Sequence, residues 1–282
     1  MKGYAVPALL VTPRELAGLL DQAGAAKPLV LDLRPPDAYT AGHVPGALHL
    51  DLWGVSLPNT DPAPLDAFMW MIEHVLAIHG VDAAVPIVVY DEHSGVRAAR
   101  GFWFLEYFGH PSVRMMDGGF NAWIAEGLPL SRDAAPSRPT EWQGSPQRQV
   151  LATWQDVKDA LGRPDAVILD TRTDEEYLGT KVRARRGGAV PGAVHIEWTR
   201  NLTPEGDFKP ASELEQMYES AGVSKDREVL AYCHGGYRAA QSYVALRLLG
   251  YPRVRMYLGS WKEWADREEL PVDVPRPSER TK

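Results

Sequence analysis

The second half of this 282-residue chain repeats the first half. Arg97-Ala98-Ala99 returns as Arg238-Ala239-Ala240, 141 positions later. The same spacing relates five further pairs, which are Gly109 and Gly250, Pro111 and Pro252, Val113-Arg114-Met115 and Val254-Arg255-Met256, Gly118 and Gly259, and Trp123 and Trp264. Chance does not produce so many matches at one spacing, so the chain must fold as two copies of one unit.

A segment without helical or strand-like periodicity separates the two copies. Residues 131–150 contain Pro136, Pro139 and Pro146 among serines, a glycine and charged residues, which is typical of a linker. We therefore expect a first domain at residues 1–130 and a second at residues 151–282, each near the common size of a domain.

Each copy alternates short apolar runs with helical stretches. Residues 29–31, 87–90, 167–169 and 229–232 are apolar runs of strand length. Helix starts are expected at three capping signatures, which are Thr12 with Glu15, Thr153 with Asp156, and Ser212 with Glu215. This alternation predicts an α/β fold, in which each domain has a mainly parallel sheet flanked by crossover helices.

The overall charge argues against two kinds of partner. Thirty basic and 37 acidic residues give a formal net charge of -7, so we expect no nucleic-acid partner and no anionic membrane surface. Prolines and charges interrupt residues 1–20, so no signal peptide is expected there, and no apolar run approaches the ~20 residues that cross a bilayer. The expected location is the cytoplasm.

The only cysteine, Cys233, lies between an apolar run and a helical pattern. A lone cysteine forms no internal disulfide and leaves no cysteine pair for zinc or an iron–sulfur cluster, so no metal or cofactor is expected. At the start of a helix, free N–H groups and the helix dipole favour a thiolate. Gly235 and Gly236 allow a nest of N–H groups, and Arg238 adds a cation. The alternative is that Cys233 is simply a small buried apolar residue.

The loop Cys233-His234-Gly235-Gly236-Tyr237-Arg238 fits the spacing Cys-x-x-Gly-x-Arg, and here the chain resembles the rhodanese family of sulfurtransferases. Further motifs occur in the family's order, namely Leu169-Asp170-Thr171-Arg172, Val190-Pro191-Gly192-Ala193 and Gly259-Ser260-Trp261. The resemblance implies two tandem rhodanese-like domains and a persulfide on Cys233.

The first copy differs from the second at the nucleophile. Its loop begins with Asp91, which cannot carry a persulfide, and spans seven positions to Arg97 where Cys233 to Arg238 spans six. The resemblance implies an inactive N-terminal domain packed on an active C-terminal one. A solvated turn is the simplest interpretation of Asp91, Glu92 and His93, and a second catalytic site is the alternative.

The resemblance also implies roles for residues around Cys233. Arg238 would bind an anionic donor, and the N–H groups of Gly235, Gly236 and Tyr237 would line the cradle. In the segment 179–188, Arg186 with Arg185 beside it would bind the donor too, unless the segment is only a solvated basic loop. His234 is either a further cation, when protonated, or a neutral loop residue. Asp170 and Arg172 would brace the loop, whereas His195, Trp198 and Trp261 are left unassigned.

Three functions compete. The leading one is transfer of sulfane sulfur from thiosulfate to a thiophilic acceptor, which is cyanide or a thiol, including a thiol on a protein. Many thiosulfate users have arginine where this chain has His234, so 3-mercaptopyruvate is the alternative donor. A rhodanese-like phosphatase would need a longer Cys-x5-Arg loop, and a non-catalytic binding module would not need Cys233 with Arg238.

Overall fold

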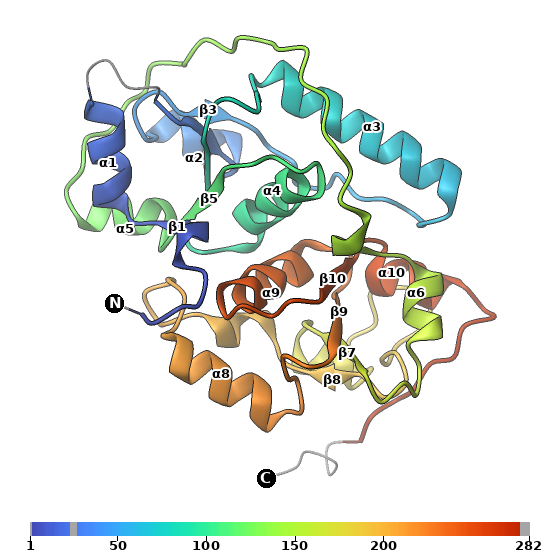
Figure 1. Cartoon of the computed structure of the whole chain (residues 1–282). Coiled ribbons are helices and arrows are strands. Elements are labelled where there is room, and N and C mark those ends of the chain that lie inside the picture. Colours follow the sequence, from blue (N-terminus) through green and yellow to red (C-terminus); the bar gives the residue numbers. More distant parts are fainter. Residues whose placement is uncertain (1, 23–26, 277–282) are drawn as a thin grey trace.

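The computed structural model describes residues 2–22 and 27–276, which form two domains of the same α/β design (Figure 1). Each domain contains a five-stranded sheet, and every pairing between neighbouring strands is parallel. The strand orders are β1-β5-β4-β2-β3 and β6-β10-β9-β7-β8, which is one topology written twice. The predicted fold class is therefore confirmed.

The strands are short, and the central ones are buried. In the first sheet they are β1 (Leu10–Val11), β2 (Leu29–Asp32), β3 (Leu48–His49), β4 (Ile87–Tyr90) and β5 (Val113–Met116). In the second they are β6 (Leu151–Ala152), β7 (Ala166–Asp170), β8 (Val194–His195), β9 (Glu228–Tyr232) and β10 (Val254–Tyr257). Asp170 pairs with Tyr232, so the ends of β7 and β9 open at one edge of the sheet, where parallel α/β proteins bind ligands.

Helices cover both faces of each sheet. Those of the first domain are η1 (Pro7–Leu9), α1 (Pro13–Asp21), α2 (Pro36–Ala41), α3 (Pro62–Ile78), α4 (Val96–Tyr107) and α5 (Gly119–Ala125). Those of the second are η2 (Arg148–Val150), α6 (Trp154–Asp159), α7 (Asp174–Tyr177), η3 (Trp198–Asn201), α8 (Ala211–Ser220), α9 (Tyr237–Leu248) and α10 (Ser260–Asp266). None of the helices in the described residues is long and apolar enough to cross a bilayer.

Two of the three predicted helix caps are correct. Thr12 with Glu15 and Thr153 with Asp156 form reciprocal capping boxes at the starts of α1 and α6. The prediction for Ser212 is wrong, because α8 begins at Ala211 after Pro210. The carbonyl of Pro210 already accepts the first helical hydrogen bond, from Leu214 N at 3.2 Å, so Ser212 lies inside the first turn.

The largest of the hydrophobic clusters in the described residues spans both domains. Helices α4 and α9 pack against each other between the two sheets (Figure 1), and the largest apolar cluster joins residues of both domains, such as Phe102 and Leu246. At this interface Glu106 accepts a hydrogen bond from Tyr243 at 2.6 Å and pairs with Arg247 at 2.9 Å. A structural element of one domain can therefore reach the loops of the other.

Candidate active site

Cys233 lies directly after β9 and four residues before Tyr237, the first residue of α9, in a loop that surrounds its sulfur. Its side chain is 1% exposed, and Gly236 N donates a hydrogen bond to Sγ at 3.1 Å. Gly236 has a φ of +89°, which favours glycine and turns this N–H toward the sulfur. The loop therefore holds the sulfur in a fixed cradle.

The N-terminus of α10 anchors this loop from the other side. Trp261 N donates to Cys233 O at 2.9 Å, and Cys233 N donates to Ser260 Oγ at 3.2 Å. Ser260 has a φ of +55° and is the one non-glycine residue with positive φ in the part of the chain that the structure describes. Its hydroxyl also donates to Tyr257 O at 2.8 Å. The motif Gly259-Ser260-Trp261 thus positions Cys233, a role for Ser260 that sequence reasoning missed.

The electrostatic surroundings of Cys233 favour the thiolate. Burial by itself raises the pKa of the thiol, but the charge of Arg238 and the N–H groups of Ala239, Gly235 and Gly236 outweigh burial and lower this pKa below its ordinary value. A thiolate is the nucleophilic form of cysteine, so the sulfur is prepared to attack.

Arg238 is not a free cation, because it forms a two-pronged ion pair with Glu176 of α7. Its Nη1 bonds Glu176 Oε2, and its Nη2 lies 3.0 Å from Oε1. Burial opposes ionisation of Glu176, yet Arg238 lowers the pKa of this carboxyl to about 2. Glu176 is 3% exposed and was not among the expected site residues. The pattern Thr173-x-x-Glu176 signals a helix start, but it does not reveal a partner 62 positions away.

Asp170 and Arg172 build a rigid corner under the loop. Arg172 Nε lies 2.9 Å from Asp170 Oδ1, and Arg172 Nη2 donates to Gly188 O at 2.7 Å. The Tyr232 hydroxyl donates to Asp170 Oδ2 at 2.5 Å and accepts from Val190 N at 3.1 Å. The first domain repeats this network with Asp32, Arg34, Tyr90, Gly42 and Val44. Since a domain without the nucleophile has the same corner, we interpret it as support for the fold.

The three arginines of the segment 179–188 each have different partners. Arg186 donates from Nε, Nη1 and Nη2 to four main-chain carbonyls at and after the end of α10, those of Ala265, Leu270, Trp264 and Arg267. Its guanidinium is therefore already engaged, which argues against the expected contact with the donor. Arg185 pairs with Glu268 at 3.2 Å. Arg183 lies 3.5 Å from Glu176 and is half-exposed, so it is the cation of this segment that borders the Arg238 pair.

Of the two states expected for His234, the structure favours the neutral one. Burial and the nearby Arg183 lower the pKa of His234 to about 4. Its Nδ1 is buried and has no hydrogen-bond partner among the described residues. The imidazole therefore contributes shape and polarity to the mouth of the loop.

The first domain contributes to the rim of the site. The Tyr237 hydroxyl donates to Leu52 O at 2.6 Å, so this residue offers more than the backbone N–H that was expected. Trp53 lies against Tyr237, with ring centroids 5.0 Å apart, and Arg97 stacks on Trp53 at 4.4 Å. The segment around residue 53 thus ties the first domain to the loop that holds Cys233.

In the first domain, Asp91 fills the loop with its own carboxylate. It accepts hydrogen bonds from the backbone N–H groups of His93, Gly95, Arg97 and Ala98 at 2.9–3.2 Å. Burial raises the pKa of this carboxyl to about 6. Asp91 is therefore buried and not part of a solvated turn, which corrects that expectation, and it occupies the space in which an external anion would bind.

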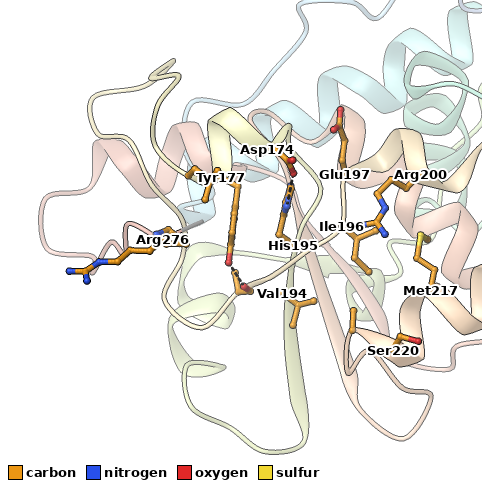
Figure 2. Close-up of a pocket in the computed structure, with 14 residues that line it drawn as sticks. Asp174, Tyr177, Val194, His195, Ile196, Glu197, Arg200, Met217, Ser220 and Arg276 are labelled. Carbon is orange, nitrogen blue, oxygen red and sulfur yellow. Dashed lines mark hydrogen bonds and ion pairs between the residues drawn. The ribbon is translucent and has the colours of Figure 1, made fainter. Parts of the chain in front are cut away.

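A cavity of about 850 Å³ opens beside β8, and no residue from 233 to 238 lines it (Figure 2). His195 lies on its wall, stacked on Tyr177 with centroids 4.4 Å apart, and Nε2–H donates to Arg172 O at 2.8 Å. The first domain has the same histidine bond, from His49 to Arg34 O at 2.9 Å. His195 thus belongs to the repeated fold, while Trp261 is buried in the core.

Comparison with known proteins matches both halves of the chain to one family. The Rhodanese-like domain family matches residues 12–126 and 153–267. A thiosulfate sulfurtransferase of Pseudomonas aeruginosa is 34% identical over 94% of this chain and 97% of its own length. One of Azotobacter vinelandii is 32% identical over 97% of this chain and 100% of its own. The sulfur carrier protein TtuD of Thermus thermophilus is 32% identical over 83% of this chain and 86% of its own.

Solved structures share the fold. The anaerobic ergothioneine biosynthesis enzyme of Chlorobium limicola, in complex with trimethyl histidine, superposes with a TM-score of 0.87. The match covers 97% of this chain and 72% of that enzyme at 22% sequence identity, a likeness that concerns the fold alone.

Proposed function

The chain belongs to the rhodanese family, as its motifs predicted, and on this basis we propose that it moves sulfane sulfur from thiosulfate to a thiophilic acceptor through a persulfide on Cys233. The relatives support the broader assignment, that of a sulfurtransferase enzyme. The observation that carries the finer assignment is the buried Cys233 sulfur, whose pKa is lowered inside a loop of N–H groups at the start of α9.

In the first step the Cys233 thiolate attacks the outer sulfur of thiosulfate. A bond forms between Sγ and that sulfur, the sulfur–sulfur bond of the donor breaks, and sulfite leaves with the bonding electron pair. Three negative charges enter the step and three leave it, two on sulfite and one on the persulfide. The loop N–H groups and the positive end of α9 stabilise the anion that stays behind.

In the second step the acceptor takes the outer sulfur. Cyanide or a thiolate attacks that sulfur, the bond to Sγ breaks, and Cys233 returns as a thiolate while thiocyanate or a new persulfide leaves. No external oxidant or reductant is required. The relative named as a sulfur carrier protein supports a thiol of a protein as one acceptor.

Thiosulfate is favoured as the donor because two relatives carry its name and because the mouth of the loop is cationic. The charge of Arg238 is shared with Glu176, so the sulfonate-like end needs another partner. Arg183 borders this pair and is half-exposed, which makes it our choice for that contact in place of Arg186. We assign the chemistry to the second domain, since Asp91 occupies the corresponding loop of the first.

The experiment that tests this function follows sulfur from donor to acceptor. Wild-type protein exposed to thiosulfate should gain the mass of one sulfur atom, lose it to cyanide and release thiocyanate. Cys233→Ser should fold and do neither, because an oxygen cannot form a persulfide. Far better use of 3-mercaptopyruvate would overturn the donor, whereas sulfur transfer by Cys233→Ser would overturn the mechanism.

A further inference from the structure

Arg100, on α4 of the first domain, is a fully buried arginine that contacts the rings of Phe104 and Tyr237 but has no hydrogen-bond partner among the described residues. Its exposed fraction is 0%, and Nε, Nη1 and Nη2 each lack a hydrogen-bond partner among the described residues. A buried guanidinium is costly unless an anion compensates for its lost hydration. A group left in this state therefore calls for a functional explanation.

The guanidinium of Arg100 faces the underside of the catalytic loop. A side-chain carbon placed on Gly236 would overlap Arg100 Nη1, so the guanidinium packs directly against this glycine, whose φ is positive. Gly236 is the residue whose N–H bonds the Cys233 sulfur. Arg100 Cζ also lies 4.9 Å from the ring centroid of Tyr237, the next residue along the chain.

The neighbouring charges leave Arg100 as the buried cation that no carboxylate balances. Arg238 is paired with Glu176, and Arg172 is paired with Asp170. Arg100 has no such ion pair in the part of the chain that the structure describes. Burial lowers the pKa of Arg100 to about 10, against the opposing influence of Tyr237 and Cys233, so the group is still charged at neutral pH.

The repeated fold supplies an internal comparison. Gln241 of α9 occupies the position equivalent to Arg100, and its Nε2 donates to Ser94 O in the first domain's loop at 3.3 Å. Each loop is thus backed by a residue of the other domain. The loop with Asp91 supplies four N–H bonds to its own carboxylate and is backed by a neutral amide. The loop with Cys233 is backed by a cation.

We propose that Arg100 is a positioning residue of the active site, the fixed counter-charge that the first domain supplies to the sulfur anion on Cys233. The persulfide part of this inference rests on the proposed function, whereas the thiolate part does not. The first domain, which lacks a nucleophile, then has an electrostatic role in the chemistry of the second. The guanidinium acts through the loop backbone and touches no substrate.

Several other charged or titratable groups lie in the catalytic loop or on the elements packed against it, and they have to be held constant in a test. They are His234, Tyr237 and Arg238 in and after the loop, Glu176 on α7, Arg183 beyond it, Arg172 after β7, and Lys262 and Glu263 on α10. Substitution at Arg100 leaves these residues themselves unchanged, although it removes the contact between Arg100 and the Tyr237 ring.

The decisive experiment compares Arg100→Met with Arg100→Lys. Ultraviolet absorbance of the thiolate, with Cys233→Ser as the baseline, measures the Cys233 pKa without a reagent having to enter the buried site. Arg100→Met should raise this pKa by about one unit or more and lower kcat/KM with thiosulfate by about tenfold. In Arg100→Lys the Cys233 pKa should lie close to the wild-type value, because lysine keeps the positive charge.

Thermal stability separates this role from a purely structural one. Removal of an unpaired buried cation should leave the unfolding temperature of Arg100→Met unchanged or raised, although activity falls. Arg247→Gln is the matched control, since Arg247 lies at the same interface but is paired with Glu106; it should leave the thiol pKa unchanged. If Arg100→Met fails to fold, the pKa in Arg100→Gln and Arg100→Lys decides instead.

A folded Arg100 variant without the charge but with the wild-type thiol pKa would overturn the proposal. The result is distinguishable from failure of the proposed function. If thiosulfate leaves no sulfur on Cys233 while the thiol pKa still depends on Arg100, the function is wrong and the counter-charge stands. If sulfur is transferred and the thiol pKa does not depend on Arg100, the proposed function stands and the counter-charge role of Arg100 is wrong.

Discussion

At the scale of single residues, the chemistry depends on which charges remain unpaired around one sulfur. Cys233 is buried, so its thiolate needs compensation from groups already fixed in the fold. Arg238 provides part of it but shares its charge with Glu176. Small changes in these surroundings should therefore alter the reactivity of the thiol more than they alter the stability of the fold.

The pH dependence of activity should report the thiol and not His234. Because the pKa of His234 is lowered to about 4, this imidazole is neutral above that pH and does not titrate near neutrality. His234→Gln should therefore leave the acidic limb of the profile of kcat/KM against pH in place. A shift of that limb by about one pH unit would show that His234 is ionised in the working range.

At the scale of elements, two charged side chains, those of Arg186 and Asp91, bond unpaired backbone groups at the ends of helices. Arg186 holds four carbonyls at and after the end of α10, where the last C=O groups of a helix lack partners. Asp91 does the converse at the start of α4, where it accepts the N–H groups of Arg97 and Ala98. The bonds of both side chains thus satisfy backbone groups at helix ends and stabilise the fold.

Arg186→Ala should reduce stability and leave the donor KM within about twofold. The substitution removes the hydrogen bonds to four carbonyls. A buried carbonyl without a hydrogen-bond partner destabilises the fold by roughly 1–3 kcal/mol. Thermal unfolding and steady-state kinetics measure the two effects, with Arg185→Ala as the exposed control. A large rise in KM for thiosulfate at unchanged stability would return Arg186 to the donor site.

Asp91→Asn should leave the turnover number within about threefold and change how stability depends on pH. Burial raises the folded-state pKa of Asp91 to about 6, above its ordinary value of 3.8. The folded state thus favours the protonated carboxyl. The protein is therefore most stable with respect to this group below about pH 4, and its free energy of unfolding decreases as the pH rises toward 6. Between about pH 4 and pH 6, the unfolding temperature of wild type should therefore fall relative to that of Asp91→Asn. Inactivity comparable to Cys233→Ser would place Asp91 in the mechanism.

At the scale of the whole molecule, the two domains form one structural unit. Their apolar cluster is continuous across α4 and α9, and polar contacts such as Thr60 Oγ1 to Glu263 at 2.8 Å join them elsewhere. The catalytic loop is held from both sides, by α10 of its own domain and by residues 52–55 of the other. The first copy, which has Asp91 in place of the cysteine, can thus serve as a wall of the site in the second copy.

Thermal unfolding should therefore be a single cooperative transition. Loss of tryptophan fluorescence, loss of helical circular dichroism and loss of activity should coincide, because the largest apolar cluster is made of residues from both domains. Two separated transitions, with activity lost in one alone, would show that the interface couples the domains weakly. Arg247→Gln should lower the midpoint without splitting it, since the apolar contacts of α4 and α9 persist.

The sequence by itself determined the repeat, the α/β class, the capping boxes at Thr12 and Thr153 and the place of Cys233 between a strand and a helix. These features depend on neighbours a few positions apart, which the sequence places together directly. Only the tertiary structure decided that Arg238 pairs with Glu176, that Arg186 binds carbonyls, that His234 is neutral and that Arg100 lies under the loop. Those outcomes depend on burial and on partners far apart in the chain, because the energy of a charge is set by what surrounds it in space.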